Sequence, residues 1–276
     1  MRFSVITPSF RNSNWLKLCI ASVADQGVEV EHIIQDAGSD DGTLAWLPQD
    51  PRVKAFVEPD GGMYDAVNRG LRRAQGDILS YLNCDEQYLP DALAGVQQFF
   101  LENPGIDVLF ADFVVVDGAG NYLFHRKVQT PRLHHTWVAH LATFTCATFF
   151  RRSVIFDRGL FFDARLKIAG DGEWMVRLLQ QRVSMAVLRR FTSVFTFTGE
   201  NLGGGAEARR EAQALCDSAP VWARRLKGLL VLHHRVRRLL GGIYFQKPFA
   251  YSLYTSESPV QRVEHQVARP KFKWKS

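Results

Sequence analysis

Four short apolar segments recur in the first 85 residues, and a polar loop follows each of them. They cover residues 3–6, 28–34, 53–57 and 78–82. Apolar residues at helical spacing follow the first segment and precede the last one. Because strands that alternate with helices usually pair in parallel, this order predicts an α/β fold, with a mostly parallel sheet flanked by helices.

Polar side chains stand at the carboxyl ends of all four predicted strands. Open α/β sheets bind their ligands outside this edge, so we expect these side chains to share one site. Asp and Asn are also ordinary loop residues, and unrelated turns are the alternative. We expect Pro8 to end the first strand, because it has no backbone donor. The candidate residues are Thr7, Pro8, Ser9, Asp36, Asp60, Asn83 and Asp85.

Residues 58–86 hold the densest group of these signals: a turn, a helix, a strand and an acidic loop. Gly61 and Gly62 allow the turn to approach a ligand closely. Asn83 and Asp85 would point the same way from an extended segment, which suits a hard cation such as Mg²⁺ or Mn²⁺. The alternative is an Asx turn that caps the next helix.

The middle of the chain adds one acidic candidate and a group of histidines. Asp171 lies at a predicted helix N-terminus, where a carboxylate is favoured, and for an isolated Asp a helix cap is the favoured interpretation. His134, His135 and His140 lie close together in the sequence, with no acidic or cysteine ligand at a useful spacing. We therefore expect them at the surface or in an acceptor groove rather than in a metal site.

The cysteines and the hydropathy of the chain indicate the cellular compartment in which we expect the protein. The four cysteines show neither metal-ligand spacing nor a paired framework, which favours a reduced, cytoplasmic protein. The N-terminus lacks the apolar core of a signal peptide, and no apolar run is long enough to cross a bilayer. We expect a protein that is not integral to the membrane.

The basic residues are concentrated late in the chain, whose formal net charge is +6. We expect a catalytic unit over residues 1–205 and a helical, basic extension over 206–276. Residues 221–240 mix apolar and basic side chains, and residues 271–275 mix lysines with aromatic residues, as in segments that lie on an anionic membrane surface. A solvated helix packed on the core is the alternative, and we expect no nucleic acid partner. The basic residues of the helical stretch are Arg224, Arg225, Lys227, Arg235, Arg237 and Arg238.

Taken together, six segments resemble the inverting family 2 glycosyltransferases, which have the Rossmann-like GT-A fold. The resemblance is to bacterial members that build lipopolysaccharide, capsule and other surface polysaccharides. It spans roughly residues 1–200, and the tail beyond about residue 205 has no part in it. The matching segments are residues 5–12, 34–43, 58–70, 76–86, 147–152 and 166–174.

The resemblance implies a role for each candidate residue. Asp36 would hold the uracil or other base, and Thr7, Pro8 and Ser9 would surround the nucleotide. Asp85 matches the last carboxylate of the Asp-x-Asp metal motif, and Asp171 matches the catalytic base. The residues that would line the nucleotide and ribose are Asp60, Asp65 and Asn68.

The implied activity is metal-dependent transfer of a sugar from a nucleotide-sugar, most simply a UDP-sugar, to a glycan or lipid-linked acceptor. Two departures from the family pattern stand out: Asn83 replaces the first carboxylate of the metal motif, and Thr145-Cys146 replaces a frequent His-Gln. The first favours the alternative of a non-catalytic nucleotide-sugar or carbohydrate binding module. A nucleotidyltransferase fits least, because the first loop lacks glycines. We expect the enzyme in the cytoplasm, and its basic extension predicts peripheral attachment to the inner face of the cell membrane.

Overall fold

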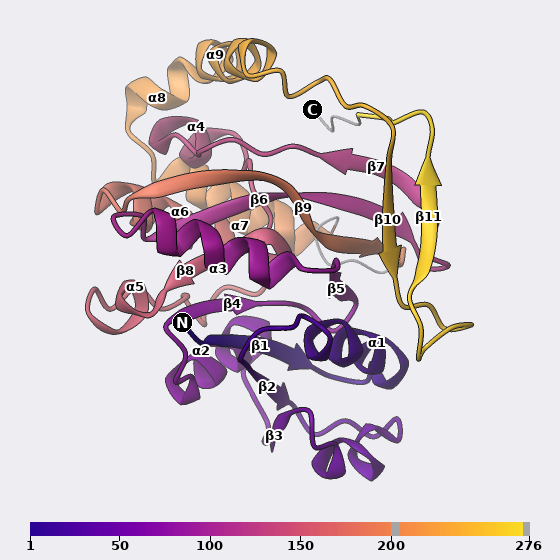
Figure 1. The fold of residues 1–276 in the computed structure, drawn as a ribbon. Helices are drawn as coiled ribbons and strands as arrows, with labels where there is room; N and C mark the ends of the chain where they lie inside the picture. The colour runs from indigo at the N-terminus through magenta and orange to yellow at the C-terminus, as the bar shows by residue number, and fades with distance from the viewer. Residues whose placement is uncertain (200–204, 273–276) are drawn as a thin grey trace.

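The structure is a computed structural model that describes residues 1–199 and 205–272 of the 276-residue chain. A large curled sheet runs through its middle, with helices around it (Figure 1). Three residues of the predicted interfacial tail, Lys273, Trp274 and Lys275, lie outside the described residues. The strands of the sheet are β1 (Phe3–Ser9), β2 (Val30–Asp36), β3 (Lys54–Val57), β4 (Ile78–Tyr81), β5 (Glu86–Tyr88), β6 (Val108–Asp117), β7 (Tyr122–Arg126), β8 (Thr148–Arg151) and β9 (Met185–Phe197).

The strand order is β3-β2-β1-β4-β8-β6-β9-β5, with β7 beside β6. The first four strands pair in parallel, as the alternating sequence pattern predicts. β8 enters antiparallel between β4 and β6, and β9 then pairs parallel to β6. The α/β architecture is thus confirmed, with parallel pairing from β1 to β4 and mixed pairing among the later strands. The helices of this part are α1 (Ser13–Ala24), α2 (Met63–Arg73), α3 (Ala92–Glu102), α4 (Leu133–Val138), α5 (Arg152–Phe156) and α6 (Gly170–Gln180).

The expectation that Pro8 ends the first strand is wrong. β1 continues to Ser9, which pairs with the last residue of β2. Bonds from Phe3 go towards the β2 side, whereas the carbonyl of Ile6 faces β4 and accepts from Leu82. Pro8 belongs to the same alternate set as Ile6, so its missing N–H faces the side where β4 has already ended, and no ladder bond is lost.

Short 3₁₀ turns lie at two places in this part. Between β2 and β3 the chain forms a pair of such turns, Thr43–Ala45 and Leu47–Gln49. A third turn, Thr145–Ala147, directly precedes β8, which begins at Thr148. That turn lies beside the pocket described below.

The C-terminal part contains more than the expected helices. After α7 (Ala206–Asp217), α8 (Val221–Arg225) and α9 (Lys227–Leu240), the chain forms a hairpin of β10 (Phe249–Leu253) and β11 (Val263–Val267). The hairpin runs along one edge of the molecule, away from α8 and α9 (Figure 1). Its Tyr251, Leu253 and Val267 form an apolar cluster with residues of β6 and β9.

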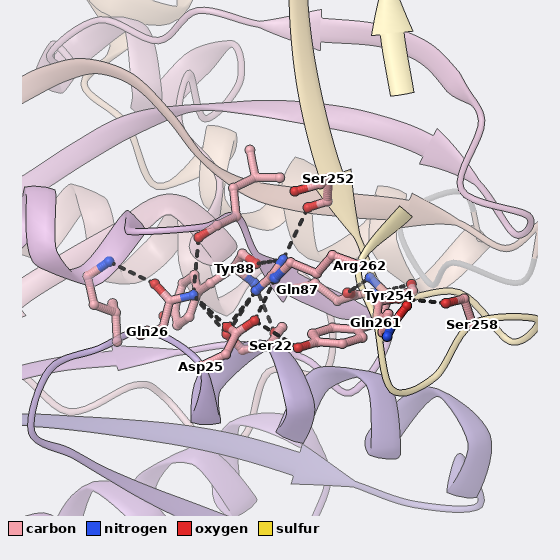
Figure 2. Close-up of polar contacts among 12 residues, drawn as sticks. Ser22, Asp25, Gln26, Gln87, Tyr88, Ser252, Tyr254, Ser258, Gln261 and Arg262 are labelled. Atoms are coloured by element: carbon pink, nitrogen blue, oxygen red, sulfur yellow. Dashed lines mark hydrogen bonds and ion pairs between the residues drawn. The ribbon is translucent and has the colours of Figure 1, made fainter. Parts of the chain in front are cut away.

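Polar contacts also bind the C-terminal part to the first helix (Figure 2). Arg262 donates to both carboxylate oxygens of Asp25, at 2.6 and 2.7 Å, and to the carbonyl oxygens of Tyr88 and Ser252 at 3.0 and 3.1 Å. Tyr254 donates to the same carboxylate at 2.8 Å. In the described part of the chain, no helix is long and apolar enough to cross a membrane.

Candidate active site

The carboxyl ends of β1 and β2 lie side by side, with Ser9 paired to Asp36. The Asp36 carboxylate is buried and accepts bonds from its own loop: the N–H groups of Gly38 and Ser39 at 2.9 and 2.7 Å, and the Ser39 hydroxyl at 2.8 Å. Gly38 has φ +92°, a left-handed conformation that glycine adopts readily. Ser9 Oγ is buried and bonds to no described residue. This edge of the sheet thus carries the loop that the Asp36 carboxylate organises, and beside it the unsatisfied hydroxyl of Ser9.

Two other predicted nucleotide contacts lie deeper than the edge. The Thr7 hydroxyl is 2.9 Å from Nε2 of buried His32. The Asn68 amide donates to the carbonyl of Phe162 at 2.8 Å and accepts from the N–H of the same residue at 3.0 Å. In this arrangement both side chains support the loops of the site from inside.

The loop after β3 is folded around its two aspartates. Asp60 accepts from the N–H of Gly62 at 2.8 Å, and burial raises the pKa of its carboxyl. Asp65 accepts from the N–H of Gly61 at 2.9 Å and pairs with Arg69 at 2.9 Å; these contacts lower its pKa. Two neighbouring carboxylates therefore have different electrostatic surroundings at the start of α2.

The acidic turn after β4 contains a residue that the sequence analysis did not single out. Glu86 is fully buried, and its Oε2 accepts from the N–H of Asn83 at 2.8 Å, while its Oε1 bonds to no described residue. Burial and the adjacent Asp85 raise the pKa of Glu86 to about 8. Burial also raises the pKa of Asp85, which has no ion pair within the described part of the chain. A cation at this turn would offset the cost of ionising these two groups.

Asp171 lies in the first turn of α6, and Tyr64 of α2 holds that turn in place. The Tyr64 hydroxyl donates to the carbonyl of Ile168 at 2.9 Å and lies 3.5 Å from Oδ1 of Asp171, while accepting from the Asp171 N–H at 3.1 Å. The N–H of Gly172 donates to the same Oδ1 at 2.8 Å. Burial raises the pKa of Asp171 to about 6.

A small pocket opens beside this carboxylate. Asp171 lines it together with Tyr81 at the end of β4, Thr143 in the loop after α4, and Phe162 and Trp174. Most of the pocket lining is aromatic or aliphatic, and a raised carboxyl pKa in such surroundings marks a candidate general base.

The segment before Asp171 is bound by a carboxylate from the C-terminal part. Glu211 of α7 accepts from three consecutive backbone N–H groups, those of Lys167, Ile168 and Ala169, at 2.7, 2.9 and 2.7 Å. Although burial opposes it, these donors lower the pKa of Glu211. The Lys167 ammonium in turn donates to the carbonyl of Gly61. The loop of Asp60 and Asp65 and the loop of Asp171 are therefore in direct contact.

Residues 4–159, more than half of the chain, match the family described as glycosyl transferase family 2. The chain belongs to this family. Its matched residues include the four parallel strands and the loops at their carboxyl ends.

Family 2 relatives match with varying coverage. An uncharacterized glycosyltransferase of Mycobacterium tuberculosis is 40% identical over 96 residues, which cover 33% of this chain and 37% of the relative. The chain thus spans well under half the length of this relative. A PGL/p-HBAD biosynthesis glycosyltransferase of Mycobacterium bovis is 27% identical over 73% of this chain and 78% of its own length.

Solved structures share the fold at low sequence identity. TarS 1–349 of S. aureus in complex with UDP-GlcNAc has a TM-score of 0.62 and 19% identity, over 87% of this chain and 73% of that one. A mannosyltransferase of Pyrobaculum calidifontis in complex with GDP-Man and Mn²⁺ has a TM-score of 0.53 and 16% identity, over 87% and 78%. Both confirm the GT-A arrangement of this family 2 chain.

Three residues of this family 2 site escaped the sequence analysis in whole or in part. Tyr64 was expected only to face the core, and its ring does so, but its hydroxyl reaches the Asp171 turn 107 residues away. Glu86 carried a usable signal, a carboxylate directly after an apolar strand. Glu211 carried none, because its contacts depend on how α7 folds back on the sheet.

Proposed function

We propose that the chain is an inverting glycosyltransferase that moves a sugar from a nucleoside diphosphate sugar to a hydroxyl of a glycan or lipid-linked acceptor. The observation that supports this most is Asp171: a carboxylate at the rim of a pocket, with its pKa raised to about 6 and its turn held by Tyr64. Cell-surface polysaccharide synthesis is the setting we infer, because the M. bovis relative is named for PGL/p-HBAD biosynthesis and family membership supports sugar transfer.

The proposed reaction is one in-line displacement at the anomeric carbon. Asp171 accepts the proton of the acceptor hydroxyl while that oxygen forms its bond to the sugar, and the bond from sugar to diphosphate breaks. A single displacement inverts the configuration at the anomeric carbon. General-base assistance of this kind contributes about 10²–10⁴-fold to the rate.

The donor would bind along the edge formed by β1 to β4. Ser9 Oγ offers an unsatisfied hydroxyl at this edge, and the Asp36 loop lies next to it. We infer a uridine nucleotide because TarS was solved with UDP-GlcNAc, and because Asp36 matches the family position that holds the base. Asp60 and Asp65 would line the ribose side.

A divalent cation, Mg²⁺ or Mn²⁺, fits the turn after β4. Asp85 would be its carboxylate ligand, with Asn83 able to supply an amide oxygen, and oxygen ligands are those that both ions prefer. The unsatisfied oxygen of Glu86 and the raised pKa of Asp85 support a missing positive charge there. When bound, the cation would neutralise charge on the diphosphate leaving group.

Calorimetry of UDP with and without Mn²⁺ tests the donor and metal assignments together. We expect Mn²⁺ to strengthen UDP binding to the wild type and to have no such effect on the Asp85→Ala variant. Asn83→Asp should retain or tighten the metal effect. Equal metal enhancement in wild type and Asp85→Ala would exclude this site, and donor binding without transfer to any acceptor would favour a non-catalytic binding module.

We also propose that α8 and α9 hold the enzyme on an anionic membrane surface, at the inner face of the cell membrane where lipid-linked acceptors would be glycosylated. Most large apolar residues of these helices face outward: Leu229, Leu232 and Leu239 are 62%, 56% and 57% exposed, whereas Leu230 packs on a small buried cluster with Ala223. The side chains that α9 buries are polar, His234 and Arg238. This orientation argues against the alternative in which the leucines complete the core.

One residue of the predicted basic face has to be removed from it. Arg238 is 4% exposed, because its guanidinium lies over the rings of Tyr244 and Phe272. The exposed cations beside the outward leucines include Arg225, Lys227 and Arg235. These are the residues that could meet lipid headgroups.

A further inference from the structure

Three histidines from separate parts of the chain converge next to the candidate active site. His135 lies in α4, His140 follows that helix, and His234 lies in α9. One ring nitrogen of each can be chosen so that all three lie within 4.8 Å of one another. The rings of His135 and His234 are stacked, with centroids 3.9 Å apart, and the His140 ring stands nearly perpendicular to both.

His135 is the member whose polar atoms most need a partner. The residue is 3% exposed, and neither of its ring nitrogens has a hydrogen-bond partner within the described part of the chain. A neutral imidazole offers one donor and one acceptor, and leaving such groups buried and unsatisfied costs free energy. The described residues therefore leave both ring nitrogens of His135 without the partner that they need.

The surroundings of the three rings disfavour their charged form. Burial, together with the neighbouring cations Arg237 and Arg238, lowers the pKa of His135 and His234 to about 3, and burial with Arg126 and Arg238 lowers that of His140 to about 4.

We propose that His135, His140 and His234 together bind one transition-metal ion, most naturally Zn²⁺. This site is separate from the turn of Asp85, where the donor would bind. Imidazole nitrogens suit Zn²⁺, Ni²⁺ and Cu²⁺, whereas Mg²⁺ and Mn²⁺ prefer oxygen. Three histidines with a fourth position for water is a recognised coordination set for Zn²⁺.

Binding requires a small rearrangement of the rings. With Zn–N bonds of about 2.0–2.1 Å, tetrahedral ligand nitrogens lie roughly 3.4 Å apart. The separation of up to 4.8 Å must therefore shorten, and the stacked rings must tilt so that both lone pairs point at one ion. Rotation of side chains accomplishes this without moving the helices.

The surroundings supply one supporting group and one opposing effect. The Gln129 amide lies 3.2 Å from Nδ1 of His234, so this ring would coordinate through Nε2 and donate from Nδ1 to the amide oxygen after a flip of that group. Arg237 and Arg238 disfavour a dication, and no carboxylate offsets them in the cluster. We therefore expect weaker binding than at a site with an acidic ligand.

An ion at this place would join the C-terminal part to the acceptor side of the pocket. His234 belongs to α9, and His140 directly precedes the segment whose Leu141, Thr143 and Phe144 line the Asp171 pocket. The metal would thus stabilise the loop that meets the acceptor, while the residues that bind the donor lie elsewhere.

The test uses the full chain, stripped of metal with a chelator and titrated with Zn²⁺ or Mg²⁺. We expect one Zn²⁺ per chain by elemental analysis after dialysis. In the Asp85→Ala variant, which lacks the carboxylate of the donor-side cation site, Zn²⁺ should raise the melting temperature and Mg²⁺ should not. Co²⁺ should give the visible absorption of a four-coordinate nitrogen site. Gln129→Ala should weaken Zn²⁺ binding by about 10–100-fold, as loss of a ligand's supporting group typically does.

The matched control for His234→Gln is His233→Gln, since His233 is the neighbouring residue of the same helix and is exposed. We expect the first variant to lose the Zn²⁺ response and the second to keep it, and Asp85→Ala to keep it as well. A wild type without stoichiometric Zn²⁺ would overturn the proposal, as would a His234→Gln variant that binds it normally. If His234→Gln does not fold, the stoichiometry and the Co²⁺ spectrum of the wild type decide.

Discussion

At the scale of single residues, the proposed role of Asp171 as general base sets two requirements for its carboxylate. The carboxylate must be ionised to accept a proton, and it must stay where the α6 turn puts it. Asp171→Asn keeps the size of the side chain and removes the base. We expect turnover to fall by about 10²–10⁴-fold with donor affinity nearly unchanged. Near-normal transfer by this variant would eliminate Asp171 as the base and make Glu173, in the same turn, the next candidate.

The pH dependence of the reaction follows from the pKa of about 6 for Asp171. Below that pH the carboxyl is protonated and cannot act as a base, so kcat/KM should fall about tenfold per pH unit, and it should level off above it. Tyr64→Phe removes a hydroxyl that favours the ionised form, so the midpoint should move to higher pH. A midpoint that stays in place in Tyr64→Phe would show that this hydroxyl does not tune the base.

At the scale of elements, we expect α7 to position the proposed base, because Glu211 of this helix binds the segment directly before Asp171. Glu211 holds three backbone N–H groups just before Asp171, so Glu211→Gln should loosen that segment. We expect kcat to drop by about tenfold or more, because small misplacements of reacting groups are costly. UDP binding measured by calorimetry should not change.

Glu207→Gln serves as the control for Glu211, since Glu207 is exposed in the first turn of the same helix. This variant should retain full turnover. Equal losses in the two variants, or a loss confined to UDP affinity, would contradict a positioning role for Glu211.

The elements also show what the sequence could and could not predict. Alternating strands and helices predicted β1 to β4, and the ends of those strands predicted an edge with Ser9, Asp36 and Asp85, because local periodicity fixes both. The hairpin of β10 and β11 was missed, since a long connection over residues 254–262 replaces the short glycine turn that announces a hairpin.

Convergence in space accounts for the other misses. The histidines at 135 and 140 were expected at the surface or in an acceptor groove because no acidic or cysteine ligand lay at a useful spacing. His234, 94 residues beyond His140, supplies the third ring only when α9 packs beside α4. The amphipathic pattern of α9 was visible in the sequence, but which residues it buries, Arg238 above all, depends on the aromatic residues that follow.

At the scale of the whole molecule, the outward leucines and cations of α8 and α9 predict reversible membrane attachment. The protein should float with anionic vesicles, remain behind with neutral ones, and be released by high salt. Changing Arg225, Lys227 and Arg235 together to Gln should weaken attachment by about 3 kcal/mol, near 1 for each cation. Activity on a soluble acceptor should survive.

A matched triple variant separates local attachment from net charge. Arg165, Arg182 and Arg190 are exposed residues outside α8 and α9, and changing all three to Gln removes the same number of charges. This variant should float as the wild type does. If both triple variants detach equally, overall charge and not the helical face governs binding; if the wild type never floats, the face has another purpose.

The contacts of Arg262 predict that the C-terminal part contributes to global stability. Its guanidinium binds the Asp25 carboxylate through two bonds and is mostly buried, with 11% of the side chain exposed. Arg262→Gln leaves that carboxylate without its cation, and we expect a loss of about 2–4 kcal/mol in the free energy of unfolding by urea. Gln261→Ala, at an exposed neighbour, should cost little, and a similar small loss for Arg262→Gln would mean that the hairpin adds little to stability.

The same contact sets an order of events during synthesis. Asp25 and Arg262 are 237 residues apart, so at about 5–20 residues per second roughly 12 to 47 seconds separate their emergence from the ribosome. The parallel strands that form the donor edge are translated early in that interval, while the hairpin that completes their support is still missing. A nascent chain paused before residue 262 would therefore already contain the strands β1 to β4 that form the proposed nucleotide-binding edge. It would still lack the contact of Arg262 with Asp25 that ties the C-terminal hairpin to this part of the molecule.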